Sequence, residues 1–435
     1  MTLAAVHLWG RQIAAVSLAD GQSIAAFEYD HAFARSGIQV SPLMMPLAPT
    51  IYSFPTLAPA SFHGLPGLLA DSLPDKFGNA LINAWLATQG RRPEDFNAVE
   101  RLLYIGNRGM GALEFKPAKG PRARKAHVID IEALVRLASD VLAHRHELQV
   151  SFADGHSHAA LQEILRVGTS AGGARAKAII AWNPKTNDVR SGQIAAGPGY
   201  SYWILKFDGV SANADKELDD PKGFGAIEYA YYKMASAAGI SMAECRLLEE
   251  NGRRHFMTRR FDRPDGGGKL HMQSLAALAH YDFNAAGAYS YEQAFYVIRR
   301  LGLPMESVEE QFRRMAFNIV ARNQDDHVKN IAFLMDKTGA WSLSPAFDVA
   351  YSYNPSGDWT AQHQMSMNGK RDRFTRADFT AVAKVAGLKR GRDKIILQEV
   401  EEAVSTWGRL AAETGIDKSL RDRIAQSHRL NIPQT

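Results

Sequence analysis

Three polar residues in the second half of the chain have the types and the spacing that phosphoryl transfer requires. Asp325 and Asn330 are five residues apart, and Asp348 follows farther along the chain. In phosphoryl transfer from ATP, one carboxylate accepts the proton of the attacking hydroxyl, while an amide and a second carboxylate hold Mg²⁺ against the phosphates. We therefore predict that Asp325 is a general base and that Asn330 and Asp348 are Mg²⁺ ligands.

The catalytic loop of protein kinases has the same Asp-x-x-x-x-Asn spacing and is followed by a metal-binding Asp. Here Phe347-Asp348-Val349 replaces Asp-Phe-Gly, and Asn323-Gln324 replaces the His-Arg before the catalytic Asp. Asp326 is a rival base, but it lies four residues from Asn330 instead of five. A solvated turn, whose Asp and Asn side chains cap neighbouring elements, is the alternative explanation of this pattern.

A helix and a hairpin are predicted on either side of this loop. Apolar residues before the loop recur at three- and four-residue spacing, as on the buried face of a helix: Val308, Phe312, Met315, Ala316, Ile319 and Val320. We expect this helix to end near Asn323. After the loop, two apolar runs at 331–335 and 340–343 flank Asp336-Lys337-Thr338-Gly339, which predicts a β-hairpin.

A glycine-rich stretch, VGTSAGGARAK at 167–177, is the second candidate for phosphate binding. Gly168 and Gly173 have the spacing of a P-loop start, but Ala174-Arg175 stand where Lys-Ser/Thr is needed, so a Walker A motif is excluded. Glycines let backbone N–H groups approach phosphate oxygens closely. The alternative is an ordinary glycine-rich turn before the apolar strand expected at 178–182.

Lys206 is the one charge in the apolar run Tyr202–Phe207. A buried lysine is costly unless it is paired, so it contacts a phosphate or protects an edge strand. Its position after the glycine-rich loop matches a kinase's phosphate-binding lysine. Glu228, near the start of the helix expected at 227–238, either pairs with Lys206 or simply favours the helix N-terminus. A strand and connector at 269–276 should form the adenine hinge.

The composition bounds the class of protein. A length of 435 residues favours two or three domains, and 46% apolar with 22% charged residues is ordinary for a soluble globular chain. The net charge of +5 permits an acidic partner without requiring one. The single cysteine, Cys245, excludes a disulfide framework. We find neither a signal peptide nor a run of about 18 apolar residues, so we expect a cytoplasmic protein with no membrane contact.

Two other polar stretches carry weaker signals. The histidines at 144, 146, 156 and 158 lack the spacing of a metal site, and we expect a surface loop there. The basic stretch KPAKGPRARK at 116–125 is either a solvated linker or a nucleic-acid contact.

Several motifs occur in order along the chain: TSAGGARAK (169–177), WILK (203–206), RRFDR (259–263), NQDDHVKN (323–330) and SPAFDV (344–349). Together they resemble the HipA-type serine/threonine kinase toxins of bacterial type II toxin–antitoxin modules. ADSLPDKFG at 70–78 is similar to the N-terminal subdomain of that family. The resemblance covers nearly the whole chain. It implies an α+β, two-lobed kinase fold, with a mixed α/β N-terminal half, a mostly helical C-terminal half and ATP in the cleft between them.

The resemblance also implies domains and site residues. The domains are an N-terminal subdomain at 1–125, a kinase N-lobe at 126–275 and a helical C-lobe at 276–435. Asp325 matches the catalytic base, Asn330 and Asp348 the Mg²⁺ ligands, and Lys206 the ATP-phosphate lysine. Further nucleotide contacts are implied at Gly172, Gly173, Ala174, Arg175, Ala176, Lys177, Ser274, Leu275, Ala276, His327, Val328 and Lys329. The three positions 274–276 match the adenine hinge by position only.

Ser170 matches the loop serine that family members autophosphorylate. A phosphoserine there places negative charge where ATP phosphates must bind, so inhibition is physically reasonable. The departure from the family at Ile227-Glu228 leaves the role of Glu228 open.

The implied function is that of an ATP- and Mg²⁺-dependent protein serine/threonine kinase acting as a toxin. The implied partners are a HipB-like helix-turn-helix antitoxin, operator DNA through the antitoxin complex, and a protein substrate, for which aminoacyl-tRNA synthetases are the family precedent. Basic residues at 370–376 and 389–394 either contact DNA phosphates or are solvated helix ends. Two alternatives stay open: a small-molecule kinase on the same scaffold, and a non-catalytic regulator that binds antitoxin and DNA.

Overall fold

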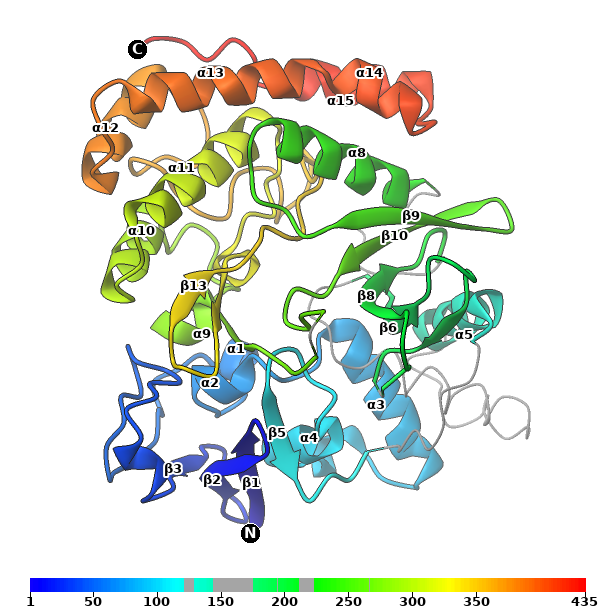
Figure 1. The fold of residues 1–435 in the computed structure, drawn as a ribbon, viewed down its shortest axis with the longest axis vertical. Helices are drawn as coiled ribbons and strands as arrows, with labels where there is room; N and C mark the ends of the chain where they lie inside the picture. The colour runs from blue at the N-terminus through cyan, green and yellow to red at the C-terminus, as the bar shows by residue number, and fades with distance from the viewer. Residues whose placement is uncertain (121–128, 144–174, 194, 211–222, 266) are drawn as a thin grey trace.

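The computed structural model combines sheets in the N-terminal half with helices toward the C-terminus, as Figure 1 shows. This arrangement is the predicted α+β fold. The structure describes residues 1–120, 129–143, 175–193, 195–210, 223–265 and 267–435.

The N-terminal subdomain is built on a five-stranded antiparallel sheet of order β4-β3-β2-β1-β5. Its strands are β1 (Thr2–Leu8), β2 (Arg11–Leu18), β3 (Ala26–Tyr29), β4 (Ile51–Tyr52) and β5 (Leu113–Lys116). Alternate residues such as Ala4, Val6 and Leu8 are buried, because successive side chains of a strand point to opposite faces. The buried face packs with three helices, α1 (Pro59–Phe62), α2 (Gly67–Ala70) and α4 (Ala98–Ile105).

A second five-stranded antiparallel sheet, of order β7-β6-β8-β10-β9, carries the candidate phosphate lysine. Its strands are β6 (Lys177–Trp182), β7 (Val189–Ser191), β8 (Ser201–Lys206), β9 (Cys245–Glu250) and β10 (Arg253–Arg259). Helices α3 (Lys76–Thr88) and α5 (Ile131–Ala143) share its apolar core. Lys177 and Lys206 are directly opposite each other in the β6–β8 register, so their side chains leave the same face of the sheet.

The third sheet contains the predicted hairpin. Strands β12 (Ala332–Met335) and β13 (Trp341–Leu343) pair antiparallel, and β11 (His271–Ser274) pairs on the other side of β12. Helix α9 (Leu275–Ala279) begins where the sequence predicted a connector. The connector is replaced by a helix because Ser274 Oγ caps the Ala277 N–H and the apolar residues 275–278 are buried in the core.

The C-terminal half is helical and surrounds one large apolar core. Its helices are α8 (Phe224–Ala237), α10 (Tyr291–Arg300), α11 (Met305–Val320), α12 (Arg376–Ala386), α13 (Arg392–Ser405), α14 (Trp407–Glu413) and α15 (Lys418–Ser427). All six residues of the predicted apolar stripe are buried in α11. The helix ends at Val320, slightly before the predicted end, and Arg322 then has a left-handed backbone with φ 59°.

Two elements connect the domains that the sequence predicts. Helix α3 belongs by sequence to the first domain but packs in the core of the second sheet. Helix α8 belongs by sequence to the second domain but packs in the C-terminal core. The boundaries at 125 and 275 therefore remain a prediction. None of the helices in the described part of the chain is long and apolar enough to span a membrane.

Candidate active site

The candidate catalytic loop connects α11 to β12 and includes the short 3₁₀ helix η4 (Val328–Asn330). Ser352 Oγ accepts hydrogen bonds from the backbone N–H groups of Gln324 at 2.7 Å and Asp325 at 2.9 Å. Asn330 Nδ2 donates to the backbone carbonyl of Asp325 at 2.8 Å. These three contacts fix the loop on both sides of the candidate base.

The Asp325 carboxylate receives one side-chain hydrogen bond and lies near one histidine. Trp359 Nε1 donates to Asp325 Oδ1 at 2.7 Å, and His327 Nε2 lies 3.7 Å from the same oxygen. The side chain is 34% exposed, so a substrate can reach it. Partial burial raises the pKa of Asp325 above its ordinary value, and the neighbouring Asp348 adds to this rise, while His327 and Trp359 oppose it. A reachable carboxylate with raised basicity suits a general base.

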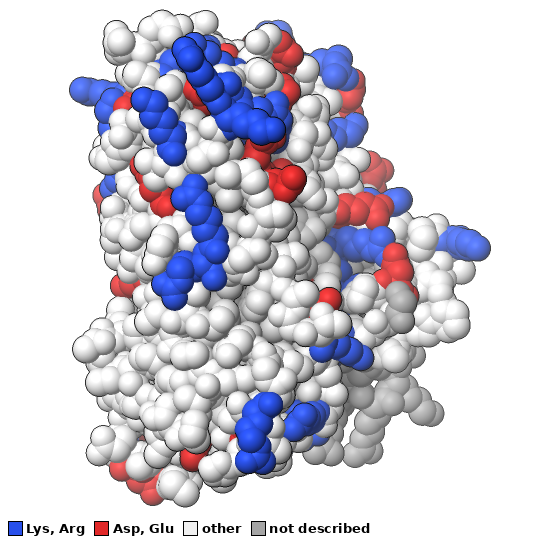
Figure 2. Space-filling view, turned by 60° about the vertical axis from the view of Figure 1, so that its left-hand side comes forward, with Lys and Arg blue, Asp and Glu red and all other residues white. Residues whose placement is uncertain are grey.

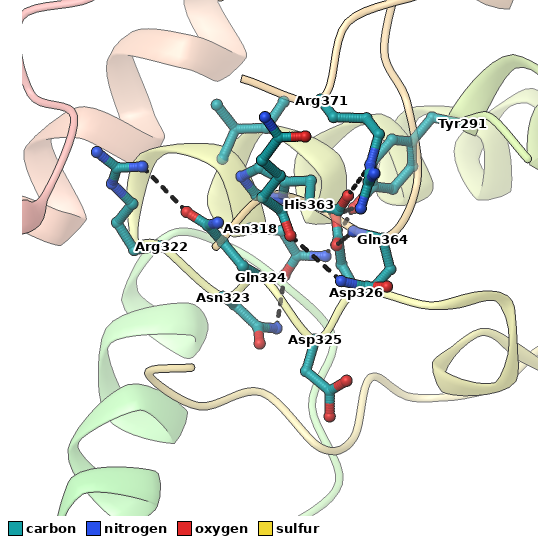
Figure 3. Close-up of polar contacts among 12 residues, drawn as sticks. Tyr291, Asn318, Arg322, Asn323, Gln324, Asp325, Asp326, His363, Gln364 and Arg371 are labelled. Atoms are coloured by element: carbon teal, nitrogen blue, oxygen red, sulfur yellow. Dashed lines mark hydrogen bonds and ion pairs between the residues drawn. The ribbon is translucent and has the colours of Figure 1, made fainter. Parts of the chain in front are cut away.

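Asp326 points instead into a buried hydrogen-bond network (Figure 3). Its Oδ2 accepts from Tyr291 Oη at 2.6 Å and from His363 Nδ1 at 2.8 Å, and its Oδ1 accepts from the Gln364 backbone N–H at 2.7 Å. Burial alone would raise the pKa of Asp326, but His363 and these hydrogen bonds lower it. Asp326 therefore anchors the loop, and Asp325 as the base stays a prediction.

The candidate phosphate lysine lies in a chain of alternating charges. Lys206 Nζ is 2.5 Å from Glu228 Oε1 and also contacts Asp348 Oδ1. Arg175 Nη1 contacts the other Glu228 oxygen at 3.0 Å. The Lys206–Glu228 pair, which the sequence left open, is confirmed. Burial would raise the pKa of Asp348, but Lys206 outweighs it and holds that pKa at about 2, so the carboxylate is ionised.

Asn330 and Asp348 line one cavity together with His327, and their chemistry fits Mg²⁺. Asn330 uses its amide nitrogen on Asp325, which leaves its carbonyl oxygen as the ligand atom. Mg²⁺ is usually held by one or two carboxylates together with water and substrate phosphates. Within the described ranges no group of three or more His, Cys, Asp or Glu side chains forms a metal cage. The fit is therefore to a metal that arrives with phosphate.

Two other predicted nucleotide contacts lie in the N-lobe. Lys177 Nζ forms a buried ion pair with Asp75 at 3.1 Å, beside Lys206 on the sheet. Ala176 is buried in the core. Lys329 Nζ lies 4.6 Å from the ring centre of Phe283. Ser170, Gly172, Gly173 and Ala174 lie outside the described residues.

The predicted adenine hinge is engaged in contacts with the protein itself. Ser274 donates its backbone N–H to Asp71 at 2.6 Å and its hydroxyl to Asp71 at 2.8 Å. The Leu275 N–H donates to the Ile331 carbonyl at 2.7 Å, and the side chains of Leu275 and Ala276 are buried in the core. An adenine contact at these positions stays a prediction that rests on the resemblance.

A segment of the N-terminal subdomain contacts both β6 and α9, and the sequence did not indicate a role for it. We call residues 67–75 the bridging segment. Asp71 binds Ser274 at the start of α9, Asp75 binds Lys177 at the start of β6, and the Gly67 N–H donates to His280 Nε2 at 3.0 Å. The two aspartates of ADSLPD were the available signal, but nothing in their spacing identified partners this far along the chain.

The RRFDR motif proves to be a second connection to the N-terminal subdomain. Asp262 accepts from Arg260 and Arg263 and from the backbone N–H of Gly111 at 2.7 Å. The two arginine charges therefore compensate the fully buried carboxylate of Asp262. Phe261 packs on Phe347, next to Asp348, with ring centres 5.6 Å apart.

Comparisons with known proteins agree with this architecture. The family described as HipA N-terminal domain matches residues 4–116, and the HipA-like C-terminal domain matches residues 169–407. The "Putative kinase Y4mE" of Sinorhizobium fredii is 27% identical over 126 residues, which cover 27% of this chain and 30% of that protein.

A solved structure of the HipA, HipB and operator DNA complex of Shewanella oneidensis MR-1 contains a chain with the same fold. The two chains align with a TM-score of 0.66 and 18% identity over 98% of this chain and 94% of that chain. Because the C-terminal family alone matches more than half of the sequence, the chain belongs to the HipA-like family.

Proposed function

We propose that this protein is an ATP- and Mg²⁺-dependent protein serine/threonine kinase that acts as the toxin of a toxin–antitoxin pair. The observation that carries the proposal is the contact of Lys206 with both Glu228 and Asp348, beside a loop that presents Asp325 and Asn330. A lysine on a strand, a helix glutamate and a metal-binding aspartate must come together for kinase chemistry. Membership of the HipA-like family supports the same activity.

In this proposal each residue has one task. Lys206 binds phosphate oxygens of ATP, Glu228 holds the lysine in place, and Arg175 holds Glu228. Asp325 takes the proton of the attacking serine or threonine hydroxyl at Oδ2, since Trp359 occupies Oδ1. Asn330 and Asp348 would hold Mg²⁺, which would supply neutralising charge to the phosphates.

The proposed partners follow from the related complex. The Shewanella HipA structure contains HipB and operator DNA, and we propose a HipB-like helix-turn-helix antitoxin as partner here, with operator DNA bound through it. We further propose a protein substrate of the aminoacyl-tRNA synthetase class, and autophosphorylation at Ser170. Both proposals rest on the family resemblance.

Intact mass after incubation with Mg²⁺-ATP tests the activity in the wild type, Asp325→Asn and Asp326→Asn. The wild type should gain one phosphate at Ser170, and Asp325→Asn should remain folded but gain none. General-base catalysis contributes about 10²- to 10⁴-fold in rate, so the loss is readily measured. Asp326→Asn should lower the free energy of unfolding by about 3 kcal/mol, because it breaks a buried charged network.

Two results would contradict the proposal. A phosphate gain that is unchanged in Asp325→Asn would remove that residue as the base. No gain in a dephosphorylated wild type that binds ATP would argue against autophosphorylation, and a small-molecule kinase or a non-catalytic regulator would then be favoured.

A further inference from the structure

Arg429, just after the last helix, reaches back to the element that carries the catalytic loop. Its backbone N–H donates to the Val320 carbonyl at 2.9 Å, and its Nη1 donates to the Ile319 carbonyl at 2.9 Å. Its Nη2 contacts Asp372 Oδ1. The guanidinium is therefore attached to the C-terminal end of α11, immediately before the loop.

The same guanidinium also contacts His363. Arg429 Nη1 lies 2.9 Å from His363 Nε2, and the histidine is fully buried. A guanidinium only donates hydrogen bonds, so Nε2 of His363 must be the acceptor. A neutral imidazole has one donor and one acceptor nitrogen, which places the proton on Nδ1. His363 Nδ1 then donates to Asp326 Oδ2 at 2.8 Å.

This contact fixes which group donates at each step of the network. Arg429 donates a hydrogen bond to His363, and His363 donates one to Asp326. Figure 3 shows His363 beside Asp326, with Tyr291 and Gln364 on the same carboxylate. Asp326 directly follows the proposed base, so every bond that holds Asp326 restricts the peptide that carries Asp325. The opposite tautomer would place a donor against the guanidinium and leave Asp326 with one hydrogen bond fewer.

Two other charged groups lie beside this network. Arg371 Nε donates to the His363 backbone carbonyl, and Asp372 balances the charge of Arg429. Burial lowers the pKa of Arg429 to about 10, with Arg322 adding to the decrease while Asp372 and Asp326 oppose it. Arg429 therefore remains a cation at neutral pH.

We infer that Arg429 is a positioning residue for the proposed base, acting through the Nδ1–H tautomer of His363 on Asp326. The inference rests on the proposed function, because it takes Asp325 as the base. It assigns a positioning role to Arg429 in the C-terminal segment. Asp325 is thereby held in place from two directions, by Trp359 at its carboxylate and by this relay at its backbone.

The first test is the steady-state kinetics of Arg429→Ala, with Arg423→Ala as the matched control because Arg423 is an exposed arginine of α15. Small displacements of a reacting group cost about 10²-fold in rate, so we expect kcat of Arg429→Ala to fall about 10- to 100-fold while KM for ATP changes little. Added millimolar guanidinium ion should restore activity to Arg429→Ala and leave Arg423→Ala and the wild type unchanged.

A loss of activity that guanidinium does not restore, in a variant as stable as the wild type, would overturn the inference, as would an unchanged kcat. If Arg429→Ala does not fold, Arg429→Lys replaces it. The lysine keeps the charge but supplies one point donor, and it should recover only part of the rate.

The second test is independent of activity. Nitrogen-15 NMR of the histidine side chains in the wild type should show His363 as the Nδ1–H tautomer, with the resonance assigned through His363→Gln. An Nε2–H tautomer would overturn the relay. A wild type without phosphotransfer that shows the expected tautomer would refute the kinase proposal and the positioning role of Arg429, and would leave the hydrogen-bond relay as a structural feature.

Discussion

Asp325 and Asp326 are neighbours in the chain, yet their carboxylates have different surroundings. Asp325 is partly exposed and receives one strong hydrogen bond, from Trp359, whereas Asp326 is buried and receives three. Burial raises the pKa of Asp325, and hydrogen bonds with His363 lower that of Asp326. When two carboxyl groups have pKa values moved in opposite directions, their environments indicate different roles.

Trp359→Phe tests the role of the Asp325 environment. The hydrogen bond from Trp359 stabilises the ionised carboxylate, so its removal should raise the pKa of Asp325 further. The base is then protonated at higher pH, and the acidic limb of the kcat profile should move to higher pH. The measurement is kcat against pH at saturating ATP.

Trp9→Phe is the control for this change, because Trp9 Nε1 donates to the Lys269 carbonyl away from the catalytic loop. If the acidic limb does not move in folded Trp359→Phe, Asp325 is not the group whose titration limits the rate.

At the scale of elements, the bridging segment connects the N-terminal subdomain to both sheets of the site. Asp71 accepts a hydrogen bond from the backbone N–H of Ser274, the N-cap residue of α9. Asp75 forms an ion pair with Lys177 on β6. Gly67 approaches α9 so closely that an added Cβ would lie 2.3 Å from the Ala277 carbonyl oxygen. The close approach explains the glycine, and the segment contacts both β6 and the start of α9.

Asp71→Ala should destabilise the protein because it leaves the buried N–H and hydroxyl of Ser274 without their acceptor. An unsatisfied buried donor costs about 1–3 kcal/mol in the free energy of unfolding, which urea denaturation measures. Asp422→Ala is the control, since Asp422 forms an exposed pair with Lys418 that is worth under about 1 kcal/mol. Equal losses in the two variants would refute the bridging role.

At the scale of the whole molecule, charge is distributed unevenly over the face in Figure 2. Lysines and arginines gather on its upper part, over the C-terminal helices, with carboxylates among them. Lys370 pairs with Asp378 at 2.7 Å, and Arg376 pairs with Glu401 at 2.6 Å. These pairs neutralise part of the basic stretch that the sequence offered for DNA contact, which favours solvated helix ends there.

Three histidines, of which His271 is buried and His280 and His428 are partly buried, make the stability of the fold depend on pH. Burial lowers the pKa values of His271, His280 and His428 from 6.5 to about 4. They lie in different places: His271 contacts the Val40 carbonyl, His280 accepts from Gly67, and His428 contacts Tyr231 Oη. Protonation of any one of them opposes packing between distant parts of the chain.

We expect the free energy of unfolding to fall as the pH falls from 6.5 to 4. The unfolded chain binds more protons than the folded chain in this window, so the contribution of the histidines is complete above pH 6.5 and is lost toward pH 4. Urea denaturation at constant ionic strength measures the slope. His280→Gln keeps an acceptor that does not titrate here, and it should flatten the curve; an identical slope would contradict the assignment.

Much of the local structure followed from the sequence. The apolar stripe at 308–320 and the hairpin around Asp336 were predicted, because helix and strand periods depend on neighbouring residues. The spacing of Asp325, Asn330 and Asp348 likewise indicated the chemistry before any contact was known. The helix at Leu275 was missed, because a buried cap and a buried apolar run override the local turn signal.

The sequence by itself determined the fold class, the family and the loop that carries the candidate chemistry. Only the tertiary structure decided which aspartate is partly exposed and which is buried, that Lys206 contacts Glu228 and Asp348, and that Trp359, Asp71 and Arg429 contact the site or the elements that hold it. The physical reason is distance along the chain. These contacts join residues from separate elements, and their partners depend on how helices and sheets pack, which no local pattern records.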